Sequence, residues 1–133
     1  MIDDCRLMIE AKVDAEVLKK RTKDFALQVL RLCQALPKNY MGDAVGKQLL
    51  RSATSVAANY RAACRARSQA EFSAKLQIVI EEADESAFWL ELIEESGLLP
   101  AERLSDLRKE ADELTAIFVS SRKTVTRNLR NPS

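Results

Sequence analysis

Hydrophobic residues recur every three to four positions through four long segments of the chain, a spacing typical of amphipathic helices. In the first segment, residues 15–36, the repeat ends immediately before Pro37, which cannot continue a helix. Its apolar face consists of Leu18, Phe25, Val29, Leu32 and Leu36. The pattern therefore predicts a helix over residues 15–36, followed by a loop with the sequence PKNYMG.

The second and third segments begin at residues that favour helix N-termini. Asp43 is the predicted N-cap of the second helix, because its carboxylate can accept hydrogen bonds from free backbone N–H groups. The apolar stripe of this helix is Val45, Leu49, Ala53, Val56, Tyr60 and Cys64. Ser68 followed by Glu71 matches a capping box and predicts the start of the third helix. The apolar face there comprises Phe72, Leu76, Val79, Ala83, Leu90 and Ile93.

The fourth segment follows Gly97, which favours a helix end, and Pro100, which the first turn of a helix tolerates. Its face contains Leu104, Leu107, Ala111, Leu114, Phe118, Ser121 and Val125. No segment keeps the period of two that is typical of a β-strand. The pattern predicts an all-α fold, an antiparallel up-down-up-down four-helix bundle, because short connections favour antiparallel neighbours. We expect an N-terminal tail at 1–14, the bundle domain at 15–130 and a C-terminal tail at 131–133.

The composition agrees with one small globular domain. Of the 133 residues, 47% are hydrophobic and 31% charged, with three glycines and three prolines. No apolar run approaches the roughly 20 residues that span a bilayer, and the acidic N-terminus does not resemble a signal peptide. We therefore expect a cytoplasmic protein with no membrane partner. The chain has three widely spaced cysteines, Cys5, Cys33 and Cys64, a number and spacing that predict reduced thiols. We expect Cys33 and Cys64 to be buried as small hydrophobic residues.

The patterns of common catalytic and metal sites are missing from the sequence. The chain has no histidine, which removes imidazole bases, Ser-His and Cys-His pairs and histidine metal ligands. Glu81, Glu82 and Glu85 could form part of a carboxylate-bridged metal site, but the accompanying Glu-x-x-His pairs are missing. There is no glycine-rich phosphate loop. We expect no enzymatic activity, no cofactor, no metal and no small-molecule substrate.

Basic side chains gather on one face of the second predicted helix, although the net charge of the chain is only +1. They lie opposite the apolar stripe, with Ser52, Ser55 and Asn59 at the margin. Asn59 has two interpretations, a hydrogen bond to the backbone of a neighbouring helix or a residue that specifies the register of the bundle. The basic face is either a solvated surface or a contact for the phosphates of RNA or DNA. Together with the C-terminal segment, which lacks acids, the candidate nucleic-acid contacts are Lys47, Arg51, Arg61, Arg65, Arg122, Lys123, Arg127 and Arg130.

The third predicted helix is acidic and has two apolar sides. In residues 71–95, Lys75 is the single base among many carboxylates, so the arginines of the second helix could pair with these acids instead of with phosphates. Ile78, Phe88, Trp89 and Leu92 fall outside its core face. A wide core, a subunit interface or a peptide partner would each explain this second side, and we favour self-association. The candidate interface residues are Ile78, Glu82, Glu85, Trp89 and Leu92, with the two glutamates pairing with basic residues of a neighbouring subunit.

The central run QLLRSATSVAANYRAACRARSQAEFSAKLQIVIEEADESAFWLELIEESGLL resembles the bacterial four helix bundle proteins, also called 23S rRNA intervening-sequence proteins. In that family an arginine-rich start leads to a Ser-x-x-x-Asn core and then to a helix of the EF...L type. Ser55 and Asn59 match the Ser-x-x-x-Asn pattern, and the resemblance covers about residues 16 to 120. Many members have a glutamate at the third position after the asparagine and then a glycine. This chain has Ala62 and Ala63 there, so no role of that glutamate carries over.

The resemblance implies an antiparallel four-helix bundle that assembles as a ring-like homopentamer and has no established enzymatic activity. Some genes of the family lie inside intervening segments of ribosomal RNA genes. A related accessory protein of diversity-generating retroelements is strongly basic and binds nucleic acid, whereas this chain is nearly neutral. Two hypotheses follow. The first is an oligomeric scaffold that contacts RNA or DNA weakly through basic stripes, and the alternative is a module that docks a partner helix through the Trp89 face.

Overall fold

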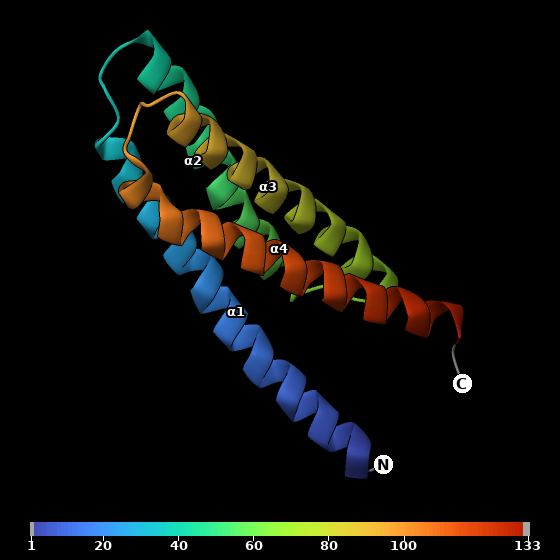
Figure 1. The fold of residues 1–133 in the computed structure, drawn as a ribbon. Helices are drawn as coiled ribbons and strands as arrows, with labels where there is room; N and C mark the ends of the chain where they lie inside the picture. Colours follow the sequence, from blue (N-terminus) through green and yellow to red (C-terminus); the bar gives the residue numbers. More distant parts are fainter. Residues whose placement is uncertain (1, 132–133) are drawn as a thin grey trace.

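The computed structural model describes the backbone of residues 2–131 and the side chains of residues 14–131. The chain forms four helices, α1 (Ile2–Gln34), α2 (Tyr40–Ala63), α3 (Gln69–Glu95) and α4 (Ala101–Arg130), and the described residues contain no strand (Figure 1). Each helix packs against the next one in the sequence, and α4 also contacts α1. Consecutive helices run in opposite directions, which confirms the predicted all-α four-helix bundle.

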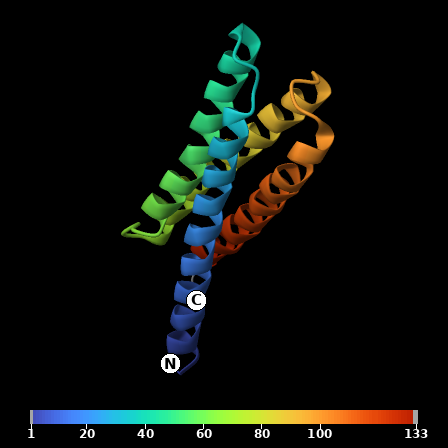
Figure 2. The same ribbon diagram turned by 90° about the vertical axis from the view of Figure 1, so that its left-hand side faces the viewer.

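The contact between α1 and α4 is the weakest of the four helix pairs. Figure 1 shows the two helices diverging toward their free ends, and Figure 2 shows the same helices turned by 90°, with the C-terminal end of α4 overlapping α1 in that view. Arg21 of α1 ties them together, because its Nε and Nη2 donate to the two carboxylate oxygens of Glu110 at 2.8 and 2.6 Å. Nη2 also donates to Glu113 at 2.6 Å. Beyond Glu113, the C-terminal part of α4 packs against α3, and Phe118 also contacts α2.

The core lies along the inner faces of the four helices and contains most of the predicted apolar positions, while others such as Leu18 and Phe72 are partly buried against it. Tyr60 of α2 packs against Phe118 of α4, with ring centroids 5.1 Å apart. Cys33 and Cys64 are free but only half-buried, so their predicted burial is wrong in degree, and the side chain of Cys5 lies outside the described residues. The fully buried side chains of the core include Phe25, Val29, Leu49, Val56, Leu76, Val79, Leu90, Ile93, Leu104, Leu114 and Phe118.

Two helix ends form where local signals predict them. The Ser68 hydroxyl accepts a hydrogen bond from the backbone N–H of Glu71 at 3.1 Å and caps α3. The return bond differs from a regular capping box, because the Glu71 carboxylate accepts from the N–H of Arg67 at 3.2 Å. At the other end of α3, Gly97 has φ +78°, a left-handed conformation that glycine adopts without strain. Pro100 is the N-cap residue that precedes α4.

The starts of α1 and α2 differ from the prediction. α1 begins at Ile2 instead of at residue 15, because the segment before residue 15 contains no glycine or proline and many good helix formers. α2 begins at Tyr40, within the predicted loop, and its N-cap is Asn39 instead of Asp43. The Asn39 side chain accepts from the N–H of Gly42 at 2.9 Å, and the Asn39 carbonyl accepts from the N–H of Asp43 at the same distance. These bonds extend the helix by one turn.

Candidate nucleic-acid interface

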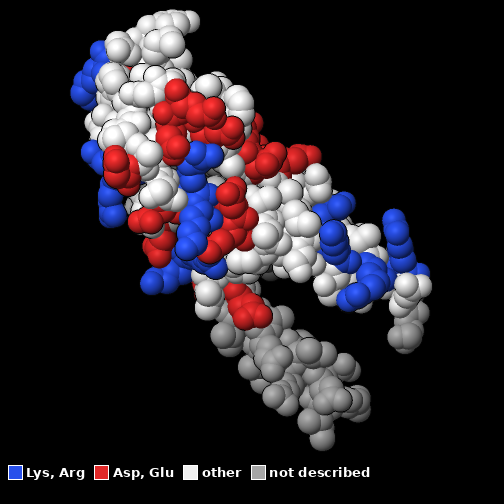
Figure 3. All heavy atoms as spheres, in the orientation of Figure 1, with Lys and Arg blue, Asp and Glu red and all other residues white. Residues whose placement is uncertain are grey.

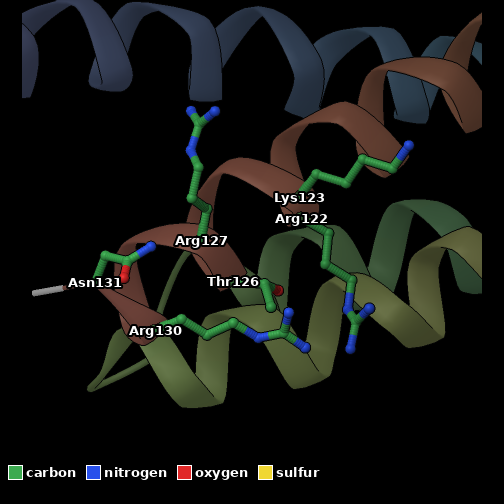
Figure 4. A pocket seen from close by; sticks show the side chains of 6 residues that line it. All are labelled: Arg122, Lys123, Thr126, Arg127, Arg130 and Asn131. Carbon is green, nitrogen blue, oxygen red and sulfur yellow. The ribbon is translucent and has the colours of Figure 1, made fainter.

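The C-terminal part of α4 carries the densest group of cationic side chains on the face in Figure 3, separated from the mixed charges of the remaining surface by uncharged side chains. Glu113 is the last acidic residue of the chain, so every ionisable side chain after it is basic. These side chains surround a surface hollow of about 310 Å³ (Figure 4). The hollow is lined by Arg122, Lys123, Thr126, Arg127, Arg130 and Asn131. This basic cluster forms because α4 continues to Arg130, so that Arg122 and Arg130 share one face of the helix and Lys123 and Arg127 share an adjacent one.

The basic cluster is joined to α3 through a single buried serine. The Nε of Arg122 donates to the backbone carbonyl of Ser73 at 3.2 Å, and the hydroxyls of Ser73 and Thr126 lie 3.4 Å apart. In Figure 4, Arg122 and Arg130 extend toward α3 on either side of Thr126, whereas Lys123 and Arg127 extend toward the opposite side. The arrangement therefore places two guanidinium groups and one hydroxyl along the α3–α4 seam.

The basic stripe of α2 is partly used within the protein. Arg51 pairs with Glu82 of α3 at 3.3 Å and also with Glu85, as the alternative interpretation of the stripe expects for this residue. Lys47, Arg61 and Arg65 are exposed, and none of them forms an ion pair with another residue of the 14–131 range. Arg51 is thus a poor phosphate contact, because its charge already has two carboxylate partners.

The small polar residues of α2 serve packing inside the protomer. Ser52 is fully buried, and its hydroxyl accepts from the Ser86 hydroxyl of α3 at 2.9 Å. Asn59 donates through Nδ2 to the carbonyl of Ser55 at 2.9 Å, one turn earlier in the same helix. The prediction that Asn59 bonds to the backbone of a neighbouring helix is therefore wrong. An asparagine side chain on a helix can bond locally to the carbonyl four residues earlier, and Asn59 does so.

The outer side of α3 exposes Ile78 and Leu92, two of the predicted interface residues, and also Phe88, which was not among them. Ile78, Phe88 and Leu92 are 42%, 53% and 38% exposed. Trp89 is half-buried, packs edge-on against Phe88 and donates through Nε1 to Glu85 at 3.2 Å. Glu85 and Glu82 already bind Arg51 of the same chain, which differs from their predicted pairing with a neighbouring subunit.

The described residues show neither a metal site nor a membrane-spanning segment. Among the side chains of residues 14–131, no three potential metal ligands of the His, Cys, Asp or Glu type lie close together. None of the helices, as far as the chain is described, combines the length and apolar character that crossing a bilayer requires.

The sequence patterns did not indicate Thr126 and Asn131, which line the hollow, or Ser73, which contacts Arg122 and Thr126. A spacing of four between Arg122, Thr126 and Arg130 is visible in the sequence and could have indicated a shared face. The contacts of Ser73 with Arg122 and Thr126 could not be predicted in this way. They depend on the position of α3 relative to α4 along the helix axes, which the sequence spacing does not give.

Comparisons with known proteins place this bundle among helical proteins of unknown function. The model of the family described as 23S rRNA-intervening sequence protein matches residues 14–120. A similar solved structure is a protein of unknown function from the S23 ribosomal protein family of Bacteroides thetaiotaomicron, with 32% sequence identity and a TM-score of 0.74. The alignment covers 79% of this chain and 97% of that one. No curated protein matches the chain.

Proposed function

The chain belongs to the 23S rRNA-intervening sequence protein family, and from this premise we propose that it binds the phosphate backbone of a nucleic-acid strand as a non-enzymatic, oligomeric helical bundle. The observation that carries the proposal is the basic cluster of α4, with Arg122, Lys123, Arg127 and Arg130 around one surface hollow. Phosphate contacts of arginine and lysine supply most of the sequence-independent affinity of proteins for nucleic acids.

The basic cluster is a better candidate than the stripe of α2 because of its surroundings. Arg51, in the middle of the stripe, is neutralised by two glutamates, whereas no acid follows Glu113 in α4. The antiparallel arrangement also brings the C-terminal end of α2 to the same end of the bundle as the C-terminal end of α4. Arg61 and Arg65 can therefore extend the contact from the basic cluster, while Arg51 remains structural.

The hollow has the composition expected of a site for backbone contacts. All six lining residues are polar or cationic, and none is aromatic. Proteins that hold single-stranded bases usually stack them on aromatic rings. Without such rings the basic cluster recognises charge and shape, so we expect weak binding with little preference for sequence. Several copies in an oligomer would raise the affinity if one strand can reach them together.

The test is the salt dependence of binding to fluorescein-labelled 20-nucleotide RNA and DNA strands, measured by fluorescence anisotropy. We expect the double variant Arg127→Gln/Arg130→Gln to flatten the slope of log affinity against log salt by about 1.4, since each lost contact to a single strand removes about 0.7. The matched control is Arg103→Gln/Lys109→Gln, which removes the same charge from exposed positions earlier in α4. Absence of binding near 50 mM salt, or an equal loss in both double variants, would refute the proposal.

The exposed apolar side of α3 supports self-association as a second part of the proposed function. Ile78, Phe88 and Leu92 lie on the outer side of α3, around the half-buried Trp89. Several large apolar side chains exposed on one side of a helix are typical of protein interfaces. We propose that a second copy of the chain covers it, and the ring of five is the assembly that the family resemblance implies. Docking of a helix from a different protein is the alternative.

A further inference from the structure

We propose that the α3–α4 seam contains a phosphate-binding site formed by Arg122, Thr126 and Arg130, in which one phosphate group is held by specific hydrogen bonds. The inference rests on the proposed function for the source of the ligand, but it assigns the recognition to three side chains on one side of the basic cluster. The ligand class is a phosphate group, either the terminal monoester of a nucleic-acid strand or an internal phosphodiester.

Arg122 is oriented before any ligand binds. Its Nε donates to the Ser73 carbonyl at 3.2 Å, and the side chain is half-buried against α3. This bond fixes the plane of the guanidinium group and leaves both terminal nitrogens available for the two-point contact that arginine makes with phosphate. Because the rotamer is already restricted, less conformational entropy is lost on binding than at a freely moving arginine.

Thr126 differs from most hydroxyl residues of the helices in its hydrogen bonding. The hydroxyls of Thr115, Ser121 and Thr124 donate to the carbonyl four residues back in α4. These hydroxyls therefore have no further proton with which to donate to a ligand. The Thr126 hydroxyl instead lies 3.4 Å from the Ser73 hydroxyl of α3, with either oxygen as donor. When the Ser73 hydroxyl is the donor of this bond, the Thr126 hydroxyl can donate a hydrogen bond to a phosphate oxygen in the hollow.

Arg130 completes the site from the far side of Thr126. In Figure 4 its side chain runs back along α4 past Thr126, so that its guanidinium group ends on the same side as that of Arg122. Lys123 and Arg127 line the same hollow but extend toward the other side, where they add charge without joining the seam. The two guanidinium groups can only donate, and the threonine hydroxyl can donate into the hollow when it accepts from Ser73, a set that suits an anionic phosphate group.

The decisive variant is Thr126→Val, which keeps the shape and the charge of the side chain while removing its hydroxyl. Using the same labelled RNA strand, we expect Thr126→Val to weaken binding about tenfold, because the lost hydrogen bond reaches a charged acceptor. The salt slope should stay as in the wild type, because no cation is removed. Arg122→Gln should weaken binding more than Arg127→Gln, although both remove one charge. Circular dichroism and thermal melting of each variant check that the bundle remains folded.

Strands with and without a 5′-phosphate distinguish the two sources of the ligand. Tighter binding of the phosphorylated strand that is lost in Thr126→Val supports a site for a terminal monoester. Equal affinity of both strands, reduced equally by Thr126→Val, supports a site for an internal phosphodiester. Wild-type affinity in Thr126→Val, with equal effects of Arg122→Gln and Arg127→Gln, would overturn the site and leave the proposed function standing.

A titration with inorganic pyrophosphate tests the site even if no strand binds. In nuclear magnetic resonance spectra of the uniformly nitrogen-15-labelled wild type, we expect saturable shifts of the Nε–H signals of Arg122 and Arg130, and none at Arg103. The shifts should shrink in Thr126→Val. Unsaturable or equal shifts at all three arginines would overturn the site.

Discussion

Polar side chains of the bundle differ in whether they bond within their own helix or across to the next one. Asn59 bonds to Ser55 of its own helix, so the asparagine of the Ser-x-x-x-Asn motif supplies no bond between helices in the protomer. Ser52 bonds to Ser86 across the α2–α3 interface, where two small hydroxyl residues satisfy each other inside the core. Residues of similar type and position on a helical wheel thus have different roles.

Tyr60 makes the stability of the bundle sensitive to alkaline pH. It is 4% exposed, and burial raises the pKa of its hydroxyl, with further contributions from Cys64 and Asp14. Above the ordinary tyrosine pKa of about 10, the unfolded chain loses this proton while the folded chain keeps it. The free energy of unfolding should therefore fall as pH rises from about 10.

The variant Tyr60→Phe isolates this effect, because it removes the hydroxyl and keeps a ring against Phe118. We expect its free energy of unfolding, measured by urea denaturation between pH 9 and about 11.5, to fall less steeply than that of the wild type. Lysines and other groups titrate in both proteins and cancel in the comparison. Parallel pH profiles would show that Tyr60 ionises as easily in the folded state as in the unfolded state.

At the scale of helices, the corner between α1 and α2 depends on glycine. A Cβ at Gly42 would lie 2.0 Å from the backbone oxygen of Pro37, whereas one at Gly46 would meet only the flexible end of Leu36 at 2.9 Å. We expect Gly42→Ala to lower the free energy of unfolding by about 1–3 kcal/mol, as overpacking against backbone does. Gly46→Ala is the matched control and should cost less, because a side chain can move. Urea denaturation of both variants measures the difference, and equal costs would contradict it.

The sequence is sufficient to predict the four helices and most of their core faces, because both follow from periodicity and local signals. Ser68 and Gly97 mark helix ends through bonds and dihedral angles within a few residues. The start of α2 is harder, because Asn39 and Asp43 are both good N-cap residues. The choice between these two N-cap residues involves the close packing of Gly42 against the backbone of Pro37. The hydrophobic periodicity of the sequence does not predict such a contact.

The candidate site is less predictable because it lies between elements. The four cations of α4 can be read from the sequence, since no acid interrupts them. The neutralisation of Arg51 by Glu82 and the contact of Arg122 with Ser73 depend on the relative positions of α2, α3 and α4. A helical wheel describes one helix at a time and cannot supply these positions.

At the scale of the whole molecule, the apolar side of α3 predicts an assembly. We expect light scattering at micromolar concentration to give a mass that is a multiple of 14.9 kDa. Phe88→Ala should weaken the assembly, because the ring is 53% exposed and its removal leaves the core intact. Met41→Ala, at a 59% exposed position of α2, is the matched control and should leave the mass unchanged. A mass near 14.9 kDa for the wild type would favour the alternative of a different protein partner.

The sparse contact between α1 and α4 has a consequence for how the chain folds. The most extensive helix contacts of the described residues join neighbours in the sequence, so their topology is mainly that of three successive hairpins. Such contacts close short loops and are associated with rapid folding. Arg21 is separated from Glu110 by 89 and from Glu113 by 92 positions, so this contact closes a very long loop and carries a large entropy cost if it forms early. We therefore expect the hairpins to form first and the α1–α4 contact to close last.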